Sequence, residues 1–139
     1  MAEAVLRHKV EQAGLTSRIE IDSAGTGDWH VGASPHHGTL QMLVENGISS
    51  EGIRARQITP RDLTVFDYII TMDADNLRNV RRLGTPAGAV IRSLLEYAPE
   101  LGLADVPDPY YTGAFAEVYS LIDSACDALL AAIRRDHHL

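Results

Sequence analysis

Residues 66–72 read Phe66-Asp67-Tyr68-Ile69-Ile70-Thr71-Met72, and this stretch decides the fold. It is rich in β-branched and aromatic side chains, which is typical of a buried strand. Asp73 comes next and can accept a hydrogen bond from a free N–H group at the start of a helix, while Leu77 and Val80 follow at helical spacing. The segment therefore predicts a strand that runs directly into a helix.

The same alternation continues on both sides of this unit. Strands are predicted at residues 19–23 and 89–91. A first helix is predicted at residues 2–13, and a second helix opens at Pro35 and ends at Asn46-Gly47, with Leu40, Leu43 and Val44 on its apolar face. Two more are predicted, one capped by Thr59 before a proline and one spanning residues 115–134.

Strands that alternate with helices predict an α/β fold in three layers, with a small parallel sheet covered by helices on both faces. At 139 residues the chain fits one domain, residues 1–139. In such sheets ligands bind beyond the carboxyl ends of the strands. The loops after Ser23, after Met72 and around Asp108 are therefore the places where a site is expected.

The strand count is low for a sheet covered on both faces, where about four to six strands are usual. The chain also opens inside a predicted helix, with no capping residue ahead of Met1. Both features predict that a first, central strand is missing. The strands at residues 19–23 and 68–72 are expected to flank its place. That space would be filled by a partner chain, collapse, or stay open as an apolar groove.

Composition excludes several classes of function. The net charge is −7, and the twelve Lys and Arg residues are scattered, so nucleic acid is not an expected partner. No apolar run approaches the roughly 20 residues of a membrane span. The single cysteine, Cys126, suits a reducing, cytoplasmic location. Adjacent histidines on a helix point apart, so neither a metal nor a cofactor is expected.

The tetrapeptide Asp108-Pro109-Tyr110-Tyr111 carries the clearest chemical signal. An acidic side chain next to two aromatic rings is suited to protonate a leaving group beside a flat substrate. The same residues also fit a plainer interpretation. Asp-Pro is common in turns, and a half-buried tyrosine can simply anchor a loop. The residues alone leave both interpretations open.

Several segments extend this signal along nearly the whole chain, in one order. They are Met1-Ala2-Glu3-Ala4, residues 22–32 (Asp22-Ser23-Ala24-Gly25-Thr26-Gly27-Asp28-Trp29-His30-Val31-Gly32), Ala55-Arg56-Gln57-Ile58-Thr59, Phe66-Asp67-Tyr68-Ile69-Ile70, Met72-Asp73, Asn76-Leu77 and Val106-Pro107-Asp108-Pro109-Tyr110-Tyr111. In this order the chain resembles the low-molecular-weight protein tyrosine phosphatases of bacteria.

The resemblance implies an enzyme that hydrolyses a phosphotyrosine protein or a small aryl phosphate through a cysteinyl-phosphate intermediate. Asp108 matches the general acid, and Ser23 matches a residue that supports the phosphate-binding loop from behind. The substrate slot is walled on two sides by the matching residues Tyr110, Tyr111, Trp29 and His30. The oligomeric state is left open by the resemblance.

One departure from the family pattern is large. The family's C-x5-R-S loop and its strand normally precede the Met-Ala-Glu-Ala segment, and this sequence contains neither. Cys126 lies within a predicted helix with no arginine placed to close such a loop, and it is expected to be buried. The 139 residues are therefore expected to be inactive by themselves. The alternatives are a non-catalytic binding module and, less favoured with one cysteine, an arsenate reductase of the same fold.

Overall fold

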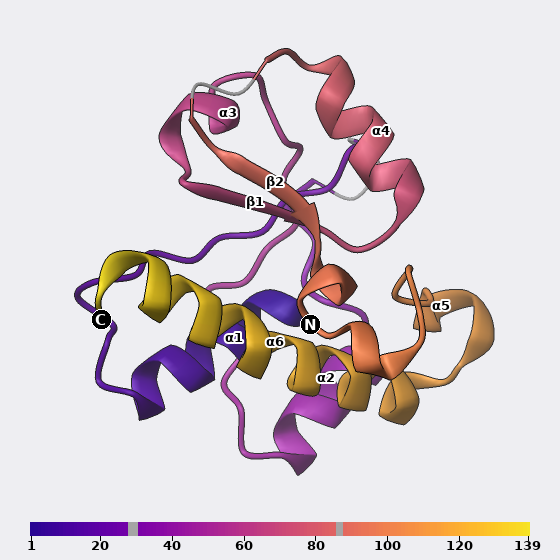
Figure 1. Ribbon diagram of the computed structural model, residues 1–139. Helices are drawn as coiled ribbons and strands as arrows, with labels where there is room; N and C mark the ends of the chain where they lie inside the picture. Colours follow the sequence, from indigo (N-terminus) through magenta and orange to yellow (C-terminus); the bar gives the residue numbers. More distant parts are fainter. Residues whose placement is uncertain (28–30, 86–87) are drawn as a thin grey trace.

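The computed structural model describes residues 1–27, 31–85 and 88–139 (Figure 1). Its sheet is formed by two parallel strands, β1 (Tyr68–Thr71) and β2 (Val90–Ser93), with Ile69 opposite Ile91. Both strands were predicted from the sequence, and their parallel pairing is confirmed. The side chains of β1 are alternately half-buried and buried along the strand, which is the pattern of a strand packed on both sides.

Three of the described helices match the sequence predictions closely. The elements are α1 (Ala2–Gln12), α2 (His37–Glu45), α3 (Asp62–Val65), α4 (Ala74–Arg82), η1 (Leu94–Tyr97), η2 (Pro99–Leu101), α5 (Pro109–Thr112) and α6 (Phe115–His137). The predictions for α1, α4 and α6 are confirmed. Asp73 caps α4 as expected, because its Oδ1 accepts a hydrogen bond from the N–H of Asn76 at 2.8 Å.

Helices cover the sheet on both sides, as Figure 1 shows: α3 and α4 lie above it, and α1, α2 and α6 lie below. Ile69 of β1 packs with Leu63 and Val80 in the smaller upper core. The neighbouring Tyr68 and Ile70 pack against the larger lower core, which is centred on α1 and α6. This alternation of side chains between two cores is what places β1 in the middle layer. The three-layer α/β arrangement is thus the one predicted.

The long helix α6 supplies more buried side chains to the lower core than any other described element. Its buried side chains recur every three or four residues, and they include the predicted Val118, Ile122, Ala125, Leu129 and Ile133. Lys9 of α1 also pairs with α6: its Nζ lies 2.8 Å from Oδ1 of Asp123 and 2.8 Å from Oδ1 of Asp127. Of the described helices, none combines the length and the hydropathy needed to cross a membrane.

Residues 19–23 are not a strand, contrary to the sequence prediction. They run extended, and the nearest pairing is a single parallel bridge between Gly25 and Gln57. The physical reason is that a strand is defined by hydrogen bonds to a neighbour. Among the described residues, β1 is paired only with β2, so residues 19–23 have the β propensity of a strand without a partner.

Two helix starts were also predicted too early. The second helix begins at His37, with His36 rather than a residue before Pro35 as its cap. α3 begins at Asp62 after a turn at Pro60, so Thr59 is not its cap. Instead the Asp62 carboxylate accepts a hydrogen bond from the Thr59 N–H at 2.8 Å. Val44, predicted on the apolar face of α2, is 77% exposed because only Leu43 of the pair faces α6.

Candidate active site

A groove separates residues 18–24 from β1. It has a volume of about 620 Å³, and its walls carry apolar side chains such as Ile19, Ile21 and Ile70, with Cys126 and Leu129 of α6 below. Its walls also include Ser23 and Met72, which place one end of the groove at the carboxyl end of β1. A groove is one of the three outcomes expected for this space. In parallel α/β sheets, this edge is where ligands bind.

Ser23 lies at that end of the groove and points to the start of α1. Its hydroxyl donates a hydrogen bond to Oε1 of Glu3, in the first turn of the helix. Its backbone N–H donates to Oδ1 of Asp22 at 2.8 Å. Ser23 is thus held at the N-terminal end of α1, where backbone N–H groups and the helix dipole favour an anion.

A cluster of charges fixes the segment next to Ser23. The Arg56 guanidinium contacts Asp22 through Nε at 2.9 Å and Asp62 through Nη1 at 3.0 Å. Burial would raise the pKa of Asp62, but hydrogen bonds from Arg56 and from the Thr59 N–H hold it below its ordinary value. The hydrogen bond to Asp62 likewise raises the pKa of Arg56. Arg56 thereby joins the end of the extended segment to α3.

Residues 55–58 hold the described residues on both sides of positions 28–30. On one side Gly25 N–H donates to Arg56 O, and Ile58 N–H donates to Gly25 O, each at 2.8 Å. On the other side Gly32 N–H donates to Ala55 O at 2.7 Å. Trp29 and His30, the two residues predicted to form one wall of the slot, lie outside the described residues.

Asp108 caps the short helix α5, and its loop is fastened to β1. Its Oδ1 accepts a hydrogen bond from Tyr110 N–H at 2.9 Å, which is the turn role that the sequence left open. Val106 N–H donates to the carbonyl of Met72 at 2.8 Å, directly after β1. Asp108 is exposed, so the cap occupies one carboxylate oxygen while the side chain stays accessible to a substrate. The two interpretations of Asp108 are therefore compatible.

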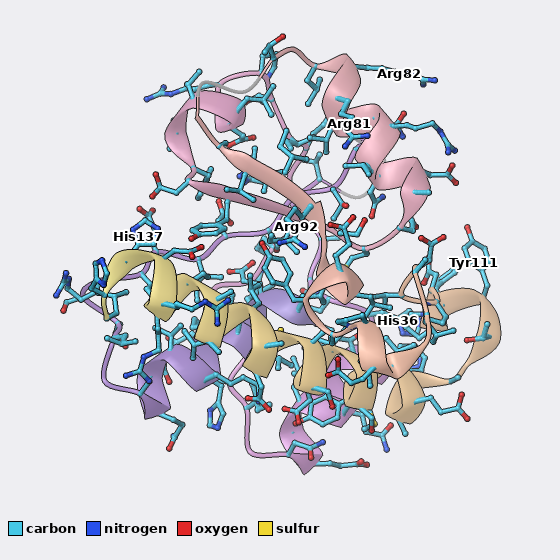
Figure 2. The ribbon with its side chains drawn as sticks, viewed as in Figure 1. His36, Arg81, Arg82, Arg92, Tyr111 and His137 are labelled. Carbon is cyan, nitrogen blue, oxygen red and sulfur yellow. The ribbon has the colours of Figure 1, made fainter. Side chains whose placement is uncertain are left out.

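Tyr110 and Tyr111 stand on the surface next to Asp108. They are 66% and 83% exposed, so neither anchors the loop by burial. Their rings meet edge to face, with centroids 5.3 Å apart. Figure 2 shows Tyr111 at the outer side of α5 and His36 near the same helix. Exposed, mutually packed rings are what a flat substrate could lie against.

The predicted site residues fall into two groups. Ser23 lines the groove, whereas Asp108, Tyr110 and Tyr111 lie beyond its lining. The link between the groups is the hydrogen bond of Val106 to Met72, which brings the loop of Asp108 to the carboxyl end of β1. In Figure 1, α5 lies on the side toward which the arrow of β2 points.

Cys126 is buried in α6, as expected, with 1% of its surface exposed. Burial raises the pKa of its thiol to about 12, so the thiolate is scarce at neutral pH. Over the described ranges, no group of three or more His, Cys, Asp or Glu side chains could hold a metal ion.

Sequence reasoning missed the residues that position the site. Arg56 contacts Asp22, which is 34 residues away in the sequence, and Asp62, which is 6 residues away. Glu3 contacts Ser23, which is 20 residues away. Such pairs leave no local periodicity in the sequence. The available signal was only that Glu3, Asp22 and Arg56 all fall within the segments that carry the family resemblance.

Comparison with known proteins agrees with this geometry. The family described as "Low molecular weight phosphotyrosine protein phosphatase" matches residues 1–139. Low molecular weight protein-tyrosine-phosphatase YfkJ of Bacillus subtilis is 48% identical over 140 residues, covering 100% of this chain and 90% of the relative. Its crystal structure matches with a TM-score of 0.93, over 97% of this chain and 86% of that one.

A further solved structure carries a different substrate in its name. DARP, described as a Drosophila arginine phosphatase, matches with a TM-score of 0.87 and 30% identity, over 96% of this chain and 88% of that one.

Proposed function

Because the chain belongs to the low-molecular-weight phosphotyrosine protein phosphatase family, we propose that it hydrolyses phosphotyrosine in proteins or small aryl phosphates, with Asp108 as the general acid. The observation that carries the proposal is the position of Asp108. It is accessible, it is adjacent to two exposed tyrosines, and its loop is hydrogen-bonded to the carboxyl end of β1.

The reaction has two displacements at phosphorus. A cysteine thiolate attacks the phosphorus, the bond to the tyrosyl oxygen breaks, and Asp108 gives its proton to that leaving oxygen. Water then attacks the cysteinyl phosphate and gives a proton to the Asp108 carboxylate. Inorganic phosphate leaves and the thiolate returns. Tyr110 and Tyr111 form one wall of the slot for the aromatic ring, and Trp29 and His30 form the other.

The thiolate must come from a segment other than the one that holds Cys126. That thiol is enclosed in α6, and its raised pKa keeps it protonated at neutral pH. We therefore place the nucleophile and the phosphate-binding arginine outside these 139 residues, on a strand and C-x5-R-S loop. By themselves the 139 residues are expected to be inactive.

The groove between residues 18–24 and β1 supports this placement. It has the apolar walls that a central strand requires, and it ends beside Ser23 and the N-terminal turn of α1. A loop that emerged there would meet free backbone N–H groups at the N-terminus of α1, which stabilise phosphate and lower the pKa of a nearby thiol. Ser23 would support the loop from behind.

Two other functions are less well supported. A non-catalytic binding module would have no use for an accessible acid on a loop hydrogen-bonded to the carboxyl end of β1. An arsenate reductase needs further thiols, and Cys126 is the only cysteine of the sequence. That single thiol, buried and unpaired, also suits the cytoplasmic location that we propose.

The test compares the 139-residue chain with the same chain extended by a strand and a C-x5-R-S loop. The substrates are p-nitrophenyl phosphate, a phosphotyrosine peptide and phosphoarginine. Only the extended chain should turn over, and it should prefer the aryl phosphates. Cys→Ser in the added loop should abolish turnover, while Cys126→Ala should not.

Two results would overturn the proposal. The first is clear hydrolysis by the 139-residue chain, whether or not it survives Cys126→Ala, which would overturn our placement of the nucleophile outside these residues. The second is a preference of the extended chain for phosphoarginine over both aryl phosphates, since the tyrosine-walled slot would then have the wrong substrate.

A further inference from the structure

Four aromatic rings form a row on the surface, from the start of α6 to α5. His36 stacks on Phe115, with centroids 5.2 Å apart and planes inclined by 12°. The ring of Tyr110 meets His36 edge to face, at 5.5 Å and 86°, and Tyr111 meets Tyr110 in the same way. Among the described ring pairs, His36 is the ring outside α5 that Tyr110 meets. Figure 2 shows His36 near α5, on which Tyr111 lies.

Besides the neighbouring ring of His37, whose centroid lies 4.2 Å away, two independent contacts hold the plane of the His36 ring. One is the stack on Phe115. The other is a hydrogen bond in which Nδ1 of His36 accepts from Gly38 N–H at 3.0 Å, so the imidazole caps α2. The stack depends on the glycine, because a Cβ at position 38 would lie 2.6 Å from ring atoms of Phe115. The ring of His36 is therefore held on its face and at its edge.

Tyr110 has no comparable support of its own. It belongs to a helix of four residues and is 66% exposed, so the helix does not restrict its ring. Tyr111 is still more exposed, and among the described residues the aromatic ring that it meets is that of Tyr110. Of the two tyrosines, Tyr110 is the one whose orientation is set by a fixed neighbour.

We propose that His36 is a positioning residue that orients Tyr110 as the specificity-determining wall for aryl phosphates. The inference rests on the proposed function and names the residue that determines its substrate preference. A ring that is already oriented binds a flat substrate with less loss of conformational freedom. The contacts of His36 are with Phe115, Gly38 and Tyr110 rather than with the acid Asp108, so we expect it to act on substrate binding rather than on the chemical step.

Two substitutions separate the two contacts of His36. His36→Asn keeps a side chain that caps a helix and removes the ring, whereas His36→Phe keeps a ring and removes the cap. Both are made in the active enzyme that carries the phosphate loop. Steady-state kinetics compare p-nitrophenyl phosphate with an alkyl phosphate, β-glycerophosphate. His138→Asn is the control, because His138 is exposed and its left-handed backbone (φ 54°) tolerates asparagine.

His36→Asn should raise KM for p-nitrophenyl phosphate by about three- to tenfold, the range expected for the loss of one aromatic pair, with kcat within about twofold. KM for β-glycerophosphate should not change. His36→Phe should restore KM for the aryl substrate while lowering Tm through the lost cap. In a Tyr110→Ala background, His36→Asn should have no further effect on KM, because the wall that it positions is gone.

The inference is wrong if His36→Asn leaves KM for the aryl substrate unchanged, or raises it equally in the Tyr110→Ala background. It is also wrong if His36→Phe and His36→Asn change KM alike. No turnover of p-nitrophenyl phosphate by the unsubstituted enzyme would instead contradict the proposed function itself, so the two failures are distinguishable.

Discussion

The guanidinium of Arg56 and the carboxylate of Asp62 form a paired hydrogen bond: Nη1 lies 3.0 Å from Oδ2 and Nη2 lies 3.2 Å from Oδ1. Through Nε the same guanidinium reaches Asp22, next to Ser23. A two-point contact between planar groups fixes direction as well as distance. Arg56 therefore sets the position of the extended segment that forms one wall of the groove.

We predict that Asp62→Asn lowers the free energy of unfolding by about 1–3 kcal/mol at pH 7, since it weakens a two-point hydrogen bond between charged, partly buried groups. The pKa of Asp62 is lowered in the folded state. Its contribution is therefore present above the unfolded pKa of about 4 and is lost as the pH falls through the folded pKa.

Urea unfolding at pH 7 and at pH 3 measures this effect. The difference between the wild type and Asp62→Asn should be smaller at pH 3. Asp75→Asn is the matched control, because Asp75 pairs with Arg78 on the surface of α4, and such exposed pairs add little. An equal loss from both substitutions, or a difference that does not change with pH, would contradict the prediction.

The buried thiol of Cys126 should be unreactive in the folded protein. Because of the same burial, the free energy of unfolding should fall at alkaline pH. Burial raises its pKa to about 12, and the unfolded thiol titrates near pH 9. Its contribution to stability is thus present below about pH 9 and falls by about 1.4 kcal/mol per pH unit above it. The checks are the rate of alkylation by iodoacetamide at pH 8 and urea unfolding at pH 8 and 10.

Cys126→Ala should reduce the loss of stability between pH 8 and 10. A smaller loss should remain, because burial and the hydrogen bond to Asp136 raise the pKa of Tyr68 to about 12 as well. Alkylation of the folded protein at the rate of a free cysteine would show that the thiol is accessible, and it would reopen the question of the nucleophile.

Asp108→Asn in the active enzyme should slow the hydrolysis of phosphotyrosine by about 10²–10⁴-fold, the range typical of general acid catalysis, and slow p-nitrophenyl phosphate much less. The leaving nitrophenolate has a low pKa and needs little help from a proton. Asparagine is as good a helix cap as aspartate, so α5 should be unaffected.

Asp105→Asn is the control for Asp108→Asn, because Asp105 is exposed in the same loop. It should leave both rates unchanged. If Asp108→Asn slowed all leaving groups equally, or lowered Tm, Asp108 would be only the cap of α5.

Gly38→Ala should cost about 1–3 kcal/mol, because the new methyl group would overlap the ring of Phe115 and displace it from His36. Thermal unfolding measures the loss, and Phe115→Leu in the same chain should recover part of it. Gly25→Ala is the control, since a Cβ there would meet its nearest atoms at an ordinary 3.9 Å. Equal destabilisation by both substitutions would show that the effect is not a contact with Phe115.

The sequence by itself determined the elements that depend on local patterns. Residues 66–72 predicted β1, Asp73 predicted the start of α4, and the spacing of Val118 to Ile133 predicted the buried face of α6. Propensity, caps and periodicity act between residues that are near each other in the chain, so they can be seen without a structure. The segments that carry the family resemblance also identified the phosphatase family.

Only the tertiary structure decided what depends on distant partners. Residues 19–23 have the composition of a strand, yet they lie extended beside a groove because no described strand pairs with them. His36 has no special spacing from Phe115 or Tyr110 in the sequence, and their rings meet only after α2, α5 and α6 have packed. Pairing and ring contacts of this kind are fixed by three-dimensional proximity, which no local pattern encodes.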